Sequence, residues 1–221
     1  MHTTKASFIG ALAFVLFTTS LFFVLEPSIG RSATDSFLVS QTITDEVSFT
    51  VASADVTMVG SIAGLTGGYA TGTTYVVVRS NDPQGYNMTL VFSSTTAMSG
   101  TTSGAINNYT PTATTAPDFL WVDNSTGGAA EFGYTVRAST SGEVDPSFMN
   151  NGSACNVGAT ETDERCWQNP STTPETIMNV STAVLSSTTT IKFKVAVPSS
   201  PSPALPSGLY VATGTLTATN N

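Results

Sequence analysis

Apolar side chains recur at every second position along most of the patterned segments of this chain, and this period of two constrains the fold more than any other feature. A β-strand places successive side chains on opposite faces, so such a segment offers one face to a core and one to solvent. No segment after residue 33 shows a helical stripe of useful length. The predicted strands cover residues 47–51, 75–78, 86–92, 132–136, 191–197 and 210–216, with an earlier strand around Phe37 and Val39. The pattern predicts an all-β, antiparallel fold with about seven to ten strands.

The first 33 residues have the organisation of an export signal. Lys5 supplies one positive charge, residues 6–25 are uncharged and largely apolar, and small residues follow Glu26 and Pro27. An apolar helix of about 20 residues is also long enough to cross a bilayer. Residues 1–33 are therefore predicted to be a signal peptide cut near residue 30, or an uncleaved N-terminal membrane anchor. Residues 34–221 are predicted to form one large β-sandwich domain, with two small sandwiches as the alternative.

The part of the chain after this segment is acidic. Fourteen of the 15 acidic residues and five of the seven basic residues lie after residue 33. No cluster of Lys and Arg is available to follow a phosphate backbone, so we expect no nucleic-acid partner. An anionic membrane surface is equally unfavourable. Contact with a membrane is expected only through the N-terminal segment, if that segment stays uncleaved.

Cys155 and Cys166 are the only cysteines of the chain. In an exported protein a small even number of cysteines favours a disulfide. A structural zinc site would need four nitrogen or sulfur ligands, and the single histidine, His2, lies inside the predicted signal. The sequence therefore predicts a disulfide that fastens a loop.

Three acidic residues, Glu161, Asp163 and Glu164, lie between the two cysteines. Carboxylates in one loop are possible ligands for Ca²⁺, but these lack the spacing of a calcium-binding loop. A solvated loop is the preferred interpretation and a calcium site the alternative. No metal site and no cofactor is predicted.

The absence of histidine after residue 2 also limits the catalytic mechanisms that are open to this chain. Serine and cysteine nucleophiles usually need an imidazole to take their proton. Lys192 and Lys194 alternate with apolar residues in the segment 191–195, so both are predicted to point to solvent, where a lysine is not an activated base. The sequence predicts no catalytic residue and no enzymatic activity.

Three connections have recognisable turn or loop chemistry. Residues 82–85 (DPQG) suit a type I turn and are predicted to join two antiparallel neighbours. Residues 60–74 are predicted to be a glycine-rich crossing loop. Residues 198–208, which contain four prolines, precede a final strand that is expected to belong to the preceding sheet.

Several runs resemble sequence motifs that recur in secreted bacterial β-sandwich proteins. These runs are ITDEVSFTVASADVTM, GLTGG, GYNMTL and the final SGLYVATGTLTATNN. They are broadly similar to the WxL and spore-coat-U groups of surface domains, and the resemblance covers about half of the chain. It implies an antiparallel Ig-like β-sandwich at the cell surface, preceded here by the N-terminal hydrophobic helix. Neither Trp121 nor Trp167 begins a Trp-x-Leu motif, and the resemblance assigns no binding residue.

These observations predict a secreted or cell-surface structural or adhesive module without catalytic activity, located outside the cell. Its expected partners are the cell envelope, other surface proteins or copies of itself, and the segment 36–43 near the N-terminus is expected to find a place in its own sheet rather than in a neighbour's. The alternative is a carbohydrate-binding module, because aromatic rings in or near loops can stack on sugars. The candidate ligand-binding residues are Tyr69, Tyr109, Trp121 and Trp167.

Overall fold

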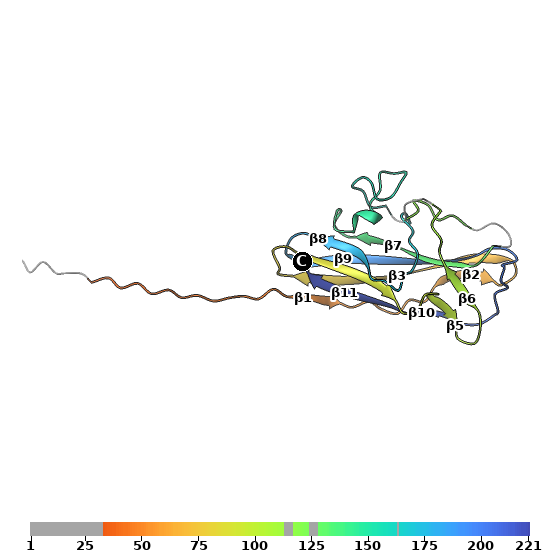
Figure 1. The fold of residues 1–221 in the computed structure, drawn as a ribbon, viewed down its shortest axis with the longest axis horizontal. Coiled ribbons are helices and arrows are strands. Elements are labelled where there is room, and N and C mark those ends of the chain that lie inside the picture. Colours follow the sequence, from red (N-terminus) through yellow and green to blue (C-terminus); the bar gives the residue numbers. More distant parts are fainter. Residues whose placement is uncertain (1–32, 113–116, 124–127, 163) are drawn as a thin grey trace, which may run out of the picture. The chain divides into compact units, whose positions relative to one another are not determined.

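A computed structural model describes residues 33–112, 117–123, 128–162 and 164–221, which divide into a short unit ending at Thr42 and a domain from Ile43 to Asn221. The predicted N-terminal hydrophobic helix lies outside the described residues. The described residues of the domain form eleven strands and one short 3₁₀ helix, Pro146–Phe148 (Figure 1). The strands are β1 (Val47–Val51), β2 (Val59–Ala63), β3 (Gly67–Ser80), β4 (Tyr86–Phe92), β5 (Met98–Gly100), β6 (Ala105–Asn108), β7 (Glu131–Ala138), β8 (Glu175–Val180), β9 (Val184–Val197), β10 (Tyr210–Ala212) and β11 (Gly214–Asn220). Within the described part of the chain, no helix is long and apolar enough to span a membrane.

The larger sheet has the strand order β1-β3-β9-β7-β6-β5-β10, and β2 pairs with the first half of β3. Its centre is the antiparallel pair of β3 and β9, whose register runs from Gly68 opposite Val197 to Ser80 opposite Val184. Among the strand pairs of the described residues, only the short pair β6 and β7 is parallel. The predicted all-β, antiparallel fold is therefore confirmed.

The smaller sheet has the order β11-β4-β8, and β4 shows why the two sheets stack. Its buried side chains occupy every second position: Tyr86, Met88, Leu90 and Phe92. They join a single core with inward side chains of the larger sheet, among them Val76, Val78, Val136 and Ile191. Burial of one face of each strand is the main driving force of such a fold.

Residues 82–85 form the predicted turn, closed by a hydrogen bond from the N–H of Gly85 to the carbonyl oxygen of Asp82 at 2.9 Å. The prediction that this turn joins two paired neighbours is wrong, because β3 belongs to the larger sheet and β4 to the smaller one. The predicted final strand over 210–216 is divided in the same way. Its first half is β10, which pairs with β5, and its second half begins β11, which pairs with β4.

The predicted crossing loop over residues 60–74 is also wrong. This segment forms β2 and the first half of β3, which pair as a hairpin with Val59 opposite Thr71. Gly67 opens β3 with a φ of +78°, and a Cβ atom there would clash with the backbone of Val197 and Pro198. The glycines of this segment thus serve a tight hairpin against β9 instead of a free loop.

The segment 33–46 is extended but pairs with no strand in the described structure, so the predicted strand around Phe37 and Val39 is wrong. Its large apolar side chains are almost fully exposed: Phe37 by 87 %, Leu38 by 90 %, Val39 by 79 % and Ile43 by 81 %. Isolated exposed apolar residues are common, but four within seven positions of an extended segment form an unusual feature.

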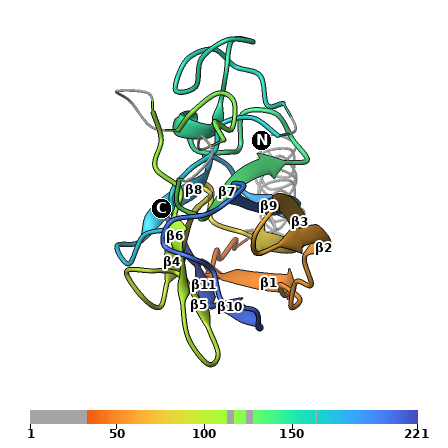
Figure 2. The ribbon, with the colours of Figure 1, turned by 90° about the vertical axis from the view of Figure 1, so that its right-hand side faces the viewer.

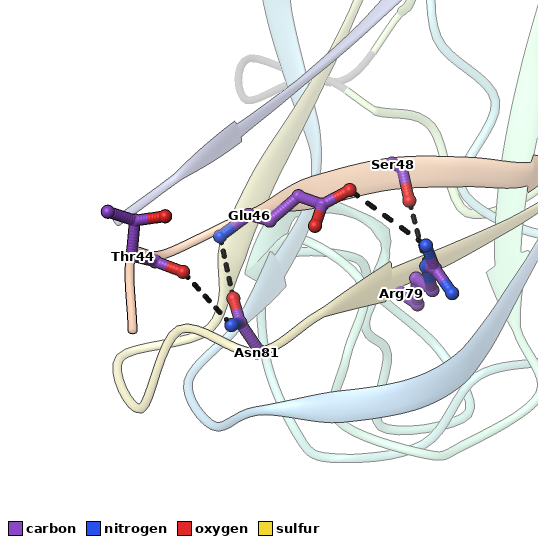
Figure 3. A network of polar contacts seen from close by, with 5 residues as sticks. All are labelled: Thr44, Glu46, Ser48, Arg79 and Asn81. Atoms are coloured by element: carbon purple, nitrogen blue, oxygen red, sulfur yellow. Dashed lines mark hydrogen bonds and ion pairs between the residues drawn. The ribbon is translucent and has the colours of Figure 1, made fainter. Parts of the chain in front are cut away.

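The start of β1 is fastened to the end of β3 by a polar clamp (Figure 3). The Asn81 side chain accepts a hydrogen bond from the N–H of Glu46 at 2.6 Å and donates one to the carbonyl oxygen of Thr44 at 3.1 Å. Arg79 adds a hydrogen bond to Ser48 at 3.0 Å and an ion pair with Glu46 at 3.9 Å. The clamp fixes where the segment 33–43 leaves the domain.

Candidate functional site

The long connections around β7 form an additional layer on the outer face of the larger sheet, and Figures 1 and 2 both show them gathered on one side of the sandwich. Two pairs of backbone hydrogen bonds hold this layer together. Asp118 and Trp167 exchange bonds of 3.0 and 2.8 Å, and Tyr134 of β7 exchanges bonds of 3.1 and 2.8 Å with Gln168. The layer therefore continues the hydrogen bonding of the sheet.

Three of the four predicted ligand-binding residues meet in this layer as an aromatic cluster. The rings of Tyr109 and Trp121 stack with their centres 4.1 Å apart, and Trp167 meets Trp121 edge-on at 5.3 Å. Tyr109 and Trp167 are buried and Trp121 is half-buried. Gly133 of β7 lies beneath them, since a Cβ atom there would be 2.9 Å from the Trp121 ring. The cluster thus fastens the outer layer to the sheet.

Asp118 organises the polar side of the cluster and is itself buried. Its Oδ2 atom accepts hydrogen bonds from the Tyr109 hydroxyl at 2.6 Å, the Thr112 N–H at 2.6 Å and the Thr112 hydroxyl at 3.1 Å. The Tyr109 oxygen accepts a further bond from the N–H of Val122 at 3.2 Å. Burial, and then the hydrogen bond to Asp118, raises the pKa of Tyr109 far above its usual value, so the phenol remains a neutral donor.

The two lysines of β9 project from the outer face as their alternation requires, but the outer layer covers them. The prediction that they point to solvent is therefore wrong. Lys192 forms an ion pair with Glu164 at 2.5 Å, and this hydrogen-bonded pair lowers the pKa of Glu164. The Lys194 Nζ atom lies 4.7 Å from the centre of the Trp121 ring and 3.7 Å from the carboxylate of Asp123. Burial lowers the pKa of Lys194, and Asp123 opposes that shift.

Tyr69, the fourth predicted ligand-binding residue, lies at the edge of the same face and is 65 % exposed. The Lys194 Nζ atom is 5.5 Å from the centre of its ring. An open pocket of about 230 Å³ lies beside it, lined among others by Tyr69, Asp123, Glu131 and Pro198. An exposed ring next to carboxylates and an ammonium group can stack on a sugar while its neighbours bond the hydroxyl groups.

The sequence did not indicate that Asp123 and Glu131 line this pocket, or that Lys194 lies beside the Tyr69 ring. Tyr69 and Lys194 become diagonal neighbours only through the register of β3 and β9, which places Thr71 opposite Lys194. Asp123 reaches the pocket from a connection that no periodicity describes. To predict this arrangement, one would need to know which distant strands pair with each other.

The two cysteines form the predicted disulfide, with their Cα atoms 5.6 Å apart. The acidic loop that it closes is not simply solvated. Glu161 turns inward and accepts hydrogen bonds from the N–H groups of Ala138 at 2.8 Å and Gly142 at 3.1 Å, and burial raises its pKa. Asp163 lies outside the described residues, and among those described no three His, Cys, Asp or Glu side chains gather closely enough to hold a metal ion.

Comparisons with known proteins assign no relationship to this chain: no family model matches the sequence, and no curated protein matches it significantly. The resemblance to the WxL and spore-coat-U groups therefore stays a prediction.

Proposed function

We propose that this protein is a non-catalytic structural or adhesive module, secreted or held at the cell surface, with an Ig-like β-sandwich as its scaffold. The observation that carries the proposal is the extended segment 36–43, which exposes Phe37, Leu38, Val39 and Ile43. Apolar surface of this extent gains free energy when a partner covers it, by about 25 cal/mol per Å². A protein that presents such a segment works by association.

Two further features support an extracellular place for this module. The disulfide between Cys155 and Cys166 forms and persists in oxidising compartments. The acidic composition after residue 33 suits a surface that does not bind nucleic acid. Both agree with the export signal expected over residues 1–33.

The proposal is tested on the producing cells. Labelling of intact cells with an antibody to the purified domain, followed by fractionation and intact-mass analysis, should detect the protein on the cell surface and recover it in the envelope fraction or in assemblies outside the cell. Recovery of the protein only in an unlabelled, intracellular fraction would contradict a surface role.

A second candidate function, carbohydrate binding, is favoured by the pocket beside Tyr69. Its exposed ring, the carboxylate of Asp123 and the covered ammonium of Lys194 provide the stacking surface and the polar groups that a sugar requires. A glycan array probed with the purified protein should identify ligands whose binding is lost in Tyr69→Ala. Tyr75→Ala is the matched control, because Tyr75 is an exposed tyrosine of the same strand outside the pocket lining. Equal binding by both variants would exclude this pocket.

A further inference from the structure

The exposed segment 36–43 has the properties of a strand that lacks a sheet. Its backbone is extended, and residues 36–44 carry no charge between Asp35 and Asp45. Phe37, Val39 and Ile43 fall on one face of such a strand, and Leu38 falls on the other. One face of the segment is therefore suited to an apolar groove.

The domain contains an apolar groove of about 570 Å³ at the end of the larger sheet that carries β2 and β10. No charged side chain lines it. Its lining includes Met58, Ile62, Ala70, Met98, Val195 and Tyr210. The uncharged stretch of the segment and the uncharged groove match in chemistry.

The groove is bordered by two strands that each have an open edge. Within the described part of the chain, β2 pairs only with β3, and β10 pairs only with β5. Both strands also expose apolar side chains, Val59 on β2 by 76 % and Val211 on β10 by 48 %. An open edge with apolar side chains is a template for an added strand.

The segment is too short to place Phe37, Val39 and Ile43 together in the groove of its own chain. The clamp holds Thr44 beside Asn81, at the far end of β3 from the groove. Ala70 and Ser80 are ten residues apart in this one strand, which corresponds to about 33 Å. Phe37 is seven residues before Thr44 and can lie at most about 25 Å from it.

We propose that residues 36–43 of one copy add as a strand to the open edge of β2 in a second copy, with Phe37, Val39 and Ile43 entering its groove. This inference rests on the proposed function and names its partner. Donor segment and acceptor groove are different surfaces, so each copy can donate to one neighbour and accept from another. Such a heterologous contact joins copies head to tail, into open chains or, where the rotation between copies closes, into rings.

The donor side is tested by mass photometry of the protein in the form in which the cell exports it. The variant Phe37→Asp/Val39→Asp should lose all species larger than the monomer, whereas the wild type forms a concentration-dependent ladder. Leu38→Asp is the matched control, because it adds the same charge to the opposite face of the segment and should retain the ladder. Persistence of the ladder in the double variant, or a wild type that is monomeric at all concentrations, would overturn the proposal.

The acceptor side is tested with Ile62→Asp, which places a charge in the groove at a half-exposed position of an edge strand. Ile62→Asp alone should be monomeric. Leu185→Asp, at a 93 % exposed position outside the groove lining, should assemble normally.

Mixing the two inactive variants provides the decisive result. Ile62→Asp still carries a donor segment and Phe37→Asp/Val39→Asp still carries a groove, so the mixture should form dimers and nothing larger. Dimers show that the donor segment of Ile62→Asp and the groove of Phe37→Asp/Val39→Asp both remain competent to bind, and their absence would overturn the proposal. A protein that is monomeric in every sample yet labelled on intact cells would overturn strand donation and leave the surface function standing.

Discussion

The hydroxyl of Tyr109 donates a hydrogen bond of 2.6 Å to the Oδ2 atom of Asp118, and both side chains are buried beneath the outer layer of the larger sheet. The same carboxylate oxygen also accepts two bonds from Thr112. A single buried oxygen thus connects the aromatic cluster to the backbone around it. Because the acceptor is charged, each of these bonds is stronger than a neutral one.

Asp118→Asn should therefore lower the free energy of unfolding by about 1–3 kcal/mol, since the accepting group loses its charge while the donors stay buried. Urea denaturation followed by tryptophan fluorescence measures this difference. Asp123→Asn is the control: its carboxylate is exposed and pairs with Lys194 at 3.7 Å, and we expect a change of less than about 1 kcal/mol. Equal losses in the two variants would show that Asp118 has no special role.

Gly133→Ala should displace the aromatic cluster from the sheet. The added Cβ atom would lie 2.9 Å from both the Trp121 ring and the Cβ atom of Tyr109, and overpacking of this kind costs about 1–3 kcal/mol. We expect a red shift of tryptophan emission together with the loss of stability. Gly214→Ala in β11 is the matched control, because its nearest neighbour would be 3.3 Å away and no tryptophan is among the nearest atoms. An unchanged emission spectrum in Gly133→Ala would contradict this account.

Removal of the disulfide by Cys155→Ala/Cys166→Ala should cost about 2–3 kcal/mol, because the cross-link restricts a short loop in the unfolded chain. The sheets should persist, since none of their strands lies between the two cysteines. Hydrogen exchange should accelerate in the segment 150–166 and remain slow in β3 and β9. Exchange that accelerates equally in these central strands would show that the disulfide supports the whole domain.

The pair of the buried Tyr134 and the half-buried Glu175 predicts a pH dependence of stability. Their oxygens are 2.7 Å apart, and burial raises the pKa of Glu175 above its ordinary value of 4.5 although the hydrogen bond from Tyr134 opposes this shift. The folded state therefore binds a proton more tightly than the unfolded state. The contribution of Glu175 to the free energy of unfolding should rise as the pH falls through its raised pKa and level off near 4.5.

Melting temperatures between neutral pH and pH 4.5 measure this effect. Glu175→Gln keeps an acceptor for the Tyr134 hydroxyl and should weaken the rise. Asp55→Asn removes an exposed carboxylate and serves as the control for the change in net charge. Identical slopes in wild type and Glu175→Gln would exclude this residue as a source of the dependence.

Local patterns predict strands well where a strand also finds a partner. The strands predicted over 47–51 and 86–92 have the bounds of β1 and β4. In β4 the side-chain period and burial agree, whereas in β1 the apolar residues Phe49 and Val51 are exposed. The same alternation at Phe37 and Val39 predicts a strand that does not form within the domain. Alternation with a period of two shows which side chains share a face of the strand. It does not show whether the edge of another strand is available for pairing.

Pairing and packing between distant segments account for the other differences between the predicted and the observed structure. The turn at 82–85 is a local structure and was predictable, whereas its role in joining two sheets depends on which strands pair with β4. Alternation places Lys194 on the outer face, but only the folded layer that contains Trp121 covers it. The same holds for the candidate pocket, since Tyr69 could be named from the sequence while Asp123 and Glu131 could not.

The clamp at Asn81 has a consequence for the response of the domain to mechanical load. The segment 33–43 continues directly into β1, and β1 lies antiparallel along β3 from the pair Val47–Ser80 onward. A pull on this segment that is opposed at the Gly67 end of β3 runs along the two strands, so the hydrogen bonds between β1 and β3 share the force in shear instead of opening one after another. The bonds of Asn81 to Thr44 and Glu46 lie at the point where the force enters. The side of the domain that carries the segment should thus resist stretching more strongly than a hairpin peeled from its end.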